Sequence, residues 1–221
     1  MSEFNLTIAE EIVLLILDDE NGAFHRLPDW SIRYALSGAL LMELAEMGRI
    51  DTDLERLFVI KEDAIDNDLL NSLLQEIVKE GGDQNIRFWV ERTAVHSDLI
   101  KEHALSTLVD KGILEQKEQK FLWVFRSRKY PIVDGRAEKE VKLRLFEVLF
   151  SDALPSPRDV VLLCLAHACG VLKAILPRRE LDRALDRIEQ VRRLDLIGQA
   201  VAKAIWDIEV SIAVSSHPQF M

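Results

Sequence analysis

Hydrophobic residues recur at three- and four-residue spacing along most of this chain, which is the spacing of amphipathic helices. The widest apolar stripe covers residues 30–49 and leaves only a narrow polar edge at Glu43 and Glu46. Such a helix has to be covered on most sides, so the sequence predicts that it lies in the core. Its small residues 37–39 predict the close approach of another helix, and Gly48 predicts its end.

Local signals mark the starts and ends of other helices. Thr7 and Glu10 form a capping box, which predicts a helix that starts near residue 8. Asp66 or Asn67 is expected to cap a later helix, and Gly112 is expected to end another. Further along, the same apolar spacing predicts helices over residues 86–93, 97–111, 134–150, 156–175, 178–194 and 195–213.

Short apolar runs predict a small amount of β-structure. Residues 57–60 form one such run and are expected to be a strand. Residues 113–114 and 121–125 flank a polar turn at 115–120, so they predict a β-hairpin.

A pattern of helix, glycine and strand occurs twice, at residues 44–60 and 108–125, and is typical of winged-helix domains. The many predicted helices and few short strands indicate a mainly α fold. We expect a single multi-helix domain over residues 1–214, with a protruding β-hairpin and minor short strands. Residues 215–221 are polar and contain a proline, so they predict a flexible tail.

Composition and charge narrow the class of protein. The 221 residues include 38 acidic and 28 basic ones, a net charge of −10, which is opposite to the balance of a general nucleic-acid binder. Two cysteines allow no disulfide framework, and no apolar run approaches the ~20 residues that span a bilayer. The first residues are too polar for a signal peptide. We therefore expect a cytoplasmic protein that associates with a membrane only peripherally.

Candidate catalytic and metal-binding residues are few. Cys164, His167 and Cys169 lie in one apolar stretch, but only the first two share a helix face, so we expect core residues rather than a metal site. The motifs GxSxG, GxxxxGK[ST] and GxGxxG, which mark hydrolase nucleophiles and phosphate-binding loops, do not occur. The sequence thus predicts no enzyme, no metal and no cofactor.

The segment 117–136 is basic in an otherwise acidic chain, with six cations and two anions. Its residues 130–133 are apolar or aromatic and are expected to form the tip of the hairpin. A basic collar around such a tip suits an anionic membrane surface, where each cation gains about 1 kcal/mol. The alternative is a solvated hairpin that packs on a neighbouring subunit. The residues expected at this membrane or oligomer contact are Arg126, Arg128, Lys129, Tyr130 and Ile132.

The start of the widest helix is a second candidate site. It combines a cation, Arg26, with the helix-starting pair Pro28 and Asp29 and the indole of Trp30. A helix start presents free N–H groups and positive potential, so it can bind an anion. The alternative is a capped helix whose tryptophan packs on its neighbours.

Four segments resemble the Golgi phosphoprotein 3 family in order and spacing: LTIAEEIVLLILDDENG (6–22), SGALLMELAEMGRI (37–50), LVDKGIL (108–114) and LAHACGVL (165–172). The resemblance covers roughly residues 6–212, and this short form is similar to prokaryotic members. It implies a mainly helical domain whose β-hairpin serves oligomer contacts and membrane docking. From the eukaryotic members it also implies binding of phosphatidylinositol 4-phosphate at a basic pocket, and recognition of glycosyltransferase tails.

The family's pocket residues match this sequence only in part. The family's tryptophan falls at Pro28, with Trp30 two places on, and an arginine of the following helix falls at Ser37. Two further arginines fall at Asp98 and Lys101, of which only the second keeps the charge. The residues that the resemblance then implies for a lipid headgroup are Trp30, Arg33, Lys101 and Arg26.

The leading hypothesis is a non-enzymatic peripheral membrane protein that binds a phosphoinositide, similar to phosphatidylinositol 4-phosphate, or another anionic lipid. Its expected partners are the lipid headgroup, the membrane surface and further copies of the chain. A winged-helix nucleic-acid binder is one alternative, although the charge opposes it and nucleic acid is not expected as a partner. A homo-oligomeric adaptor without a lipid ligand is the other.

Overall fold

The helix starts and stops that the sequence predicts are confirmed. The Thr7 hydroxyl accepts a hydrogen bond from the Glu10 N–H (3.2 Å), and the Glu10 carboxylate accepts one from the Thr7 N–H (2.6 Å). Asn67 caps its helix through its side chain. Gly48 and Gly112 adopt left-handed backbone angles (φ 63° and 70°) directly after helices, where a side chain would be strained.

The computed structural model describes residues 4–18, 22–53, 56–81, 84–121 and 125–215, with side chains described except at 118–128. Its helices are α1 (Ile8–Ile16), α2 (Asp29–Glu46), α3 (Asp68–Glu80), α4 (Ile86–Ala94), α5 (Ser97–Asp110), α6 (Gly135–Phe150), α7 (Pro157–Ala168), α8 (Val171–Ile175), α9 (Arg178–Arg192) and α10 (Leu196–Ser215). Its strands are β1 (Ile50–Thr52), β2 (Leu57–Val59), β3 (Lys117–Phe121) and β4 (Phe125–Lys129). The predicted mainly α fold is therefore confirmed, whereas the predicted tail lies largely outside the described residues.

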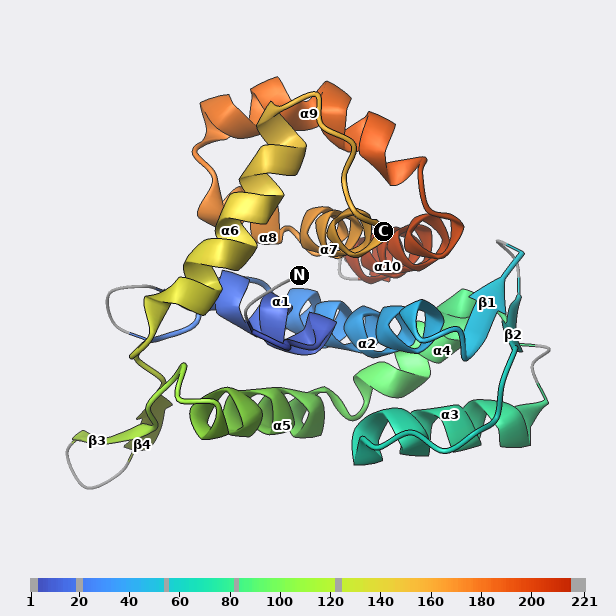
Figure 1. Cartoon of the computed structure of the whole chain (residues 1–221), viewed down its shortest axis with the longest axis horizontal. Coiled ribbons are helices and arrows are strands. Elements are labelled where there is room, and N and C mark those ends of the chain that lie inside the picture. The colour runs from blue at the N-terminus through green and yellow to red at the C-terminus, as the bar shows by residue number, and fades with distance from the viewer. Residues whose placement is uncertain (1–3, 19–21, 54–55, 82–83, 122–124, 216–221) are drawn as a thin grey trace, which may run out of the picture.

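Helices α1 and α2 cross the middle of the molecule, with α3 and α5 on one side and α6 to α10 on the other (Figure 1). Every residue of α1 is buried, as are most residues of α2. One hydrophobic core runs from Leu6 to Ile208 and joins both sides. Among the described helices, none has a stretch long and apolar enough to cross a membrane.

The small residues of α2 admit two neighbouring helices, as predicted. A Cβ placed on Gly38 would lie 2.5 Å from Leu165 Cδ2 of α7 and 3.0 Å from Val201 Cγ1 of α10. Because both distances are below normal van der Waals contact, a side chain here would force Leu165 and Val201 to shift. The close contact holds the centre of α2 against the C-terminal helices.

The strands differ in part from the prediction. Strand β2 is confirmed, and it pairs antiparallel with β1 directly after Gly48. The second hairpin is shifted along the chain, because β3 and β4 pair Lys117 with Lys129 and Phe121 with Phe125. Ile113 and Leu114, which were expected to begin it, are buried in the core instead. In the second helix–glycine–strand unit the strand therefore begins at Lys117, five residues after Gly112.

The helix predicted over residues 156–175 is two helices. Gly170 lies between α7 and α8 with φ 71°, a left-handed conformation that ends a helix. The sequence pattern concealed this break because apolar residues continue on both sides of it.

Candidate functional site

A depression of about 360 Å³ lies between the starts of α2 and α5. Helix α2 contributes its first turn and α5 contributes both its first turn and the residues that precede it. The lining residues are Asp29, Ile32, Arg33, Val95, Ser97, Asp98 and Lys101. Arg33 and Lys101, two of the four predicted headgroup residues, therefore share one depression although they lie far apart in sequence.

Both helices begin here without a side-chain cap. Pro28 precedes α2 and His96 precedes α5, and neither side chain accepts a hydrogen bond from its helix. By contrast, Thr7, Asn67 and Ser156 cap α1, α3 and α7 through their side chains. Two helix starts thus present N–H groups and positive potential toward the same depression, which favours an anion.

The depression is lined by equal numbers of positively and negatively charged side chains. Arg33 and Lys101 face Asp29 and Asp98, and the Lys101 ammonium lies 3.2 Å from the Asp98 carboxylate. Arg33 is exposed, and the Asp98 side chain is 93% exposed, so this ion pair contributes little stability. Lys101 also lies over the Phe24 ring at 6.0 Å. An anion that bound Lys101 in place of the Asp98 carboxylate would therefore break this ion pair at little cost in free energy.

Trp30 and Arg26 line a different depression, of about 310 Å³, formed with α7, α8 and α10. Trp30 is half-buried and its ring centroid lies 6.5 Å from that of Tyr34. Trp206 and Lys173 lie on other walls of this depression. The four residues predicted to bind a headgroup are thus divided between two neighbouring depressions on either side of the start of α2.

Two positions matched to the family's pocket have other roles here. Ser37 is fully buried, and its hydroxyl donates a hydrogen bond to the Val90 carbonyl (2.8 Å), so this position belongs to the core. Pro28 is the residue before α2 and is exposed.

The predicted tip of the β-hairpin is wrong. Tyr130 and Ile132 lie at its base, after β4, where Tyr130 is only 7% exposed and its N–H donates to the Gly22 carbonyl (2.9 Å). Ile132 packs against the core and pairs with Leu114. Apolar side chains at this point gain more from the core than from a solvent-exposed tip. Lys129 ends β4 and is partly exposed, whereas the side chains of Arg126 and Arg128 lie outside the described set.

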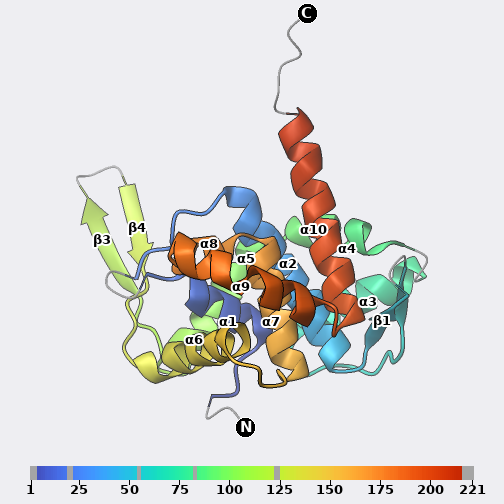
Figure 2. The same ribbon diagram turned by 90° about the horizontal axis from the view of Figure 1, so that it is seen from above.

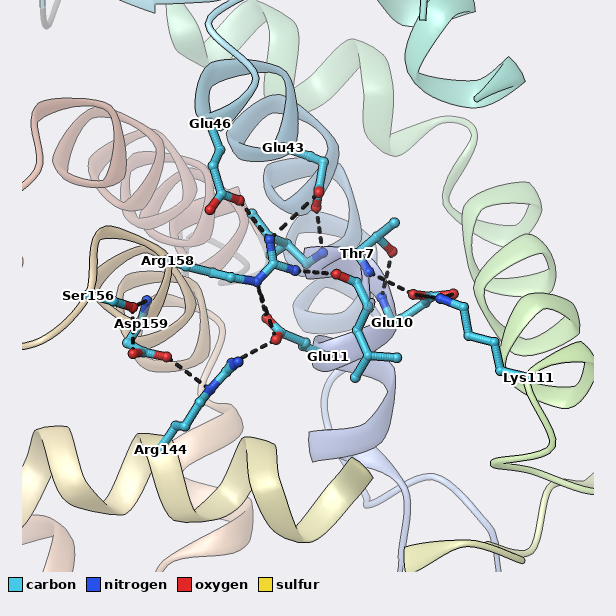
Figure 3. Close-up of polar contacts among 12 residues, drawn as sticks. Thr7, Glu10, Glu11, Glu43, Glu46, Lys111, Arg144, Ser156, Arg158 and Asp159 are labelled. Atoms are coloured by element: carbon cyan, nitrogen blue, oxygen red, sulfur yellow. Dashed lines mark hydrogen bonds and ion pairs between the residues drawn. The ribbon is translucent and has the colours of Figure 1, made fainter. Parts of the chain in front are cut away.

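Sequence reasoning missed a buried ion-pair cluster between α1, α2, α6 and α7 (Figure 3). The Glu11 carboxylate is 1% exposed and contacts Arg144 Nη2 at 2.6 Å and Arg158 Nε at 3.2 Å. Arg158 also contacts Glu46 at 2.6 Å, and its Nη2 donates to the Leu6 carbonyl at 2.6 Å. The signal was Glu11 itself, a carboxylate next to the capping Glu10 in a helix whose other residues are all apolar, because a buried carboxylate requires a cation as its partner.

The cluster has more carboxylates than cations. Arg158 Nη1 lies 3.7 Å from Glu43, and Arg144 Nε lies 3.1 Å from Asp159, so four carboxylates share two guanidinium groups. Glu43 also accepts a hydrogen bond from the Ile8 N–H at 2.5 Å. Burial raises the pKa of Glu43, with this hydrogen bond and Arg158 opposing the shift. The folded protein therefore holds a proton on Glu43 at a higher pH than the unfolded chain does.

Replacing Glu43 with glutamine should change how stability depends on pH. Protonation of Glu43 stabilises the fold fully below its ordinary pKa of 4.5, and this contribution is lost as pH rises through the higher pKa of the folded state. The wild type should therefore gain stability relative to Glu43→Gln as the pH falls from 7 toward 4.5. Urea unfolding across this range measures the difference, and Glu46→Gln controls for removal of one negative charge. A constant difference would contradict the prediction.

Cys164 and Cys169 are core residues as expected, whereas His167 is partly exposed and lines the depression that contains Trp206. Both thiols are fully buried, and burial raises the pKa of Cys164 to about 12. Burial, with help from Arg192 and Lys173, lowers the pKa of His167. Among the described residues, no group of three or more histidine, cysteine or acidic side chains is arranged to hold a metal ion.

Comparison with known proteins matches residues 8–208 to the family described as Golgi phosphoprotein 3 (GPP34). Two curated relatives are both named vacuolar protein sorting-associated protein 74. The relative from Eremothecium gossypii is 28% identical over 250 residues, which cover 96% of this chain and 74% of the relative. The relative from Schizosaccharomyces pombe is 26% identical over 246 residues, covering 96% and 72%. None of these names denotes an enzymatic activity.

Proposed function

The chain belongs to the Golgi phosphoprotein 3 family, and from this premise we propose that it is a non-enzymatic peripheral membrane protein. In this proposal the depression between α2 and α5 binds an anionic, phosphorylated lipid headgroup of the phosphoinositide kind. Arg33 and Lys101 contact the phosphate groups, and the hairpin β3–β4 touches the same bilayer.

The main support for the proposal is that the starts of α2 and α5 lie at the same depression. The residues that precede α2 and α5, Pro28 and His96, make no side-chain cap, and Arg33 and Lys101 line the depression between the two helix starts. A phosphate monoester is an acceptor of the required charge and can displace the exposed Asp98 carboxylate from Lys101. The volume of about 360 Å³ suits a ring-sized headgroup.

The orientation of the hairpin adds support. Strands β3 and β4 point to the same side of the molecule as the start of α2, at the top of Figure 2. The sequence of β4 carries Arg126, Arg128 and Lys129. A headgroup bound at α2 would bring these cations toward the same anionic surface, where each gains about 1 kcal/mol.

Reversing the two cations tests the headgroup site. Arg33→Glu combined with Lys101→Glu should weaken binding to vesicles that contain phosphatidylinositol 4-phosphate roughly thirtyfold or more, because two favourable charges become unfavourable. Co-sedimentation with phosphatidylcholine vesicles, with and without this lipid, measures the effect at low salt.

The matched control is Lys139→Glu with Arg183→Glu, which changes the net charge equally at exposed positions on α6 and α9. It should retain most of the binding. If the wild-type protein does not pellet with any anionic vesicle at low salt, or if both double variants bind equally well, the proposal is wrong.

A further inference from the structure

The C-terminal end of α10 extends beyond the other helices (Figure 2), and α4 contacts it as far as Ser211, whose hydroxyl accepts a hydrogen bond from Arg87 (3.2 Å). Three large apolar side chains are exposed there: Trp206 is 48% exposed, Val210 61% and Val214 71%. These three residues are four apart and so lie on one face of the helix. No acidic or basic residue occurs between Val210 and Ser215, whereas Lys203 and Asp207 pair nearer the body at 2.9 Å. The helix is therefore charged at its base and apolar toward its end.

The base of this stripe combines aromatic rings with cations. Trp206 and Trp30 line the depression of about 310 Å³, together with two cations, Arg26 and Lys173, and one acidic residue, Glu209. The Arg192 guanidinium lies over the Trp206 ring at 5.6 Å. Indole rings and long cationic side chains are the groups that favour the headgroup level of a bilayer, where an apolar ring and a charged tip are both accommodated.

The order of groups from the depression outward to the end of α10 matches the layers of a bilayer surface. Cations and indoles at the base would meet phosphates, and the valines beyond them would reach the upper acyl chains. The same side of the molecule carries the start of α2 and the hairpin β3–β4, while the described residues that precede α1 lie on the opposite side (Figure 2). A bilayer that approaches the depression between α2 and α5 therefore meets the end of α10 as well.

We propose that the exposed end of α10 is a membrane-inserting element, with Val210 and Val214 entering the interfacial region of an anionic bilayer and Trp206 at headgroup level. This inference rests on the proposed function, because the headgroup site brings the bilayer to this side. A second copy of the chain fits the surface less well: the stripe offers a few hundred Å², whereas a stable dimer buries roughly 800 Å² per partner.

Acidic substitutions at the end of α10 test the element. Val210→Asp combined with Val214→Asp should weaken partitioning into vesicles of roughly four parts phosphatidylcholine to one part phosphatidylserine by about tenfold or more, since carboxylates are excluded from the interface. The control is Leu143→Asp with Leu185→Asp, which places the same charges on exposed apolar positions of α6 and α9. Thermal unfolding establishes that both variants fold. The control should partition as the wild type does.

Tryptophan fluorescence supplies an independent measurement. The test uses a Trp30→Phe, Trp123→Phe background, because Trp30 lines the same depression and Trp123 lies between β3 and β4 in the sequence, whereas Trp89 is fully buried. Brominated phosphatidylcholine in the same vesicles should quench the fluorescence of this background protein, and adding Trp206→Phe should remove most of the quenchable signal. A Val210→Asp, Val214→Asp variant that binds like the wild type overturns the inference. So does quenching of the Trp30→Phe, Trp123→Phe protein that persists when Trp206→Phe is added. The inference is also wrong if light scattering shows that the wild type is a dimer and the Val210→Asp, Val214→Asp variant a monomer, while the variant binds vesicles as well as the wild type does.

The two sets of variants distinguish the headgroup site between α2 and α5 from the membrane-inserting end of α10. If Arg33→Glu with Lys101→Glu abolishes binding while the valine variant binds normally, the headgroup site stands and the role of α10 is wrong. If the valine variant loses binding and the Arg33, Lys101 variant does not, the α10 element is supported and the headgroup site is wrong.

Discussion

Replacing Arg158 with methionine should lower the free energy of unfolding by about 3–5 kcal/mol, because it leaves buried carboxylates without their cation. Arg158 contacts Glu11, Glu43 and Glu46 and also the Leu6 carbonyl. Methionine preserves much of the side-chain volume, so the loss reflects charge rather than a cavity. After the substitution, Arg144 alone balances the buried Glu11.

Chemical denaturation at neutral pH measures this loss, and thermal unfolding should show a midpoint lower by roughly 6–20 °C for a chain of this size. The control is Arg193→Met on α9, whose ion pair with Glu189 is mostly exposed and should contribute less than about 1 kcal/mol. Equal losses in the two variants would show that the cluster does not stabilise the junction of α1, α2, α6 and α7.

Replacing Gly22 with alanine should cost about 2–4 kcal/mol of folding free energy. Gly22 has a left-handed backbone (φ 62°), and a Cβ there would overlap the backbone of Tyr130 and Pro131. Both the strain and the overlap oppose the contact in which the Tyr130 N–H donates to the Gly22 carbonyl at 2.9 Å. Because this contact ties the loop before α2 to the base of β3–β4, the substitution should also loosen the hairpin.

Gly48→Ala is the matched control, since Gly48 has nearly the same φ of 63° but nothing within 4 Å of its added Cβ. It should cost only the backbone strain, about 1–2 kcal/mol. Urea unfolding gives both values, and hydrogen exchange of the Tyr130 amide reports the hairpin base. If the two alanine variants lose the same stability, the close packing of Gly22 on residues 130–131 has no energetic role.

The sequence by itself determined the features that depend on neighbouring residues. The capping box at Thr7 and Glu10, the cap at Asn67 and the helix ends at Gly48 and Gly112 were all predicted and confirmed, because their hydrogen bonds and backbone angles are local. The helical spacing of apolar residues likewise predicted the mainly α fold and the buried α2.

Only the tertiary structure decided which distant side chains meet. Glu11 finds its cations more than a hundred residues away, at Arg144 and Arg158, and no local spacing encodes that pairing. Tyr130 was expected at an exposed tip but lies in the core beside Gly22. The helix starts at α2 and α5 converge, yet Trp30 faces a separate depression with Trp206. Helix packing sets these positions, since it depends on burying apolar area across the whole chain rather than on any one segment.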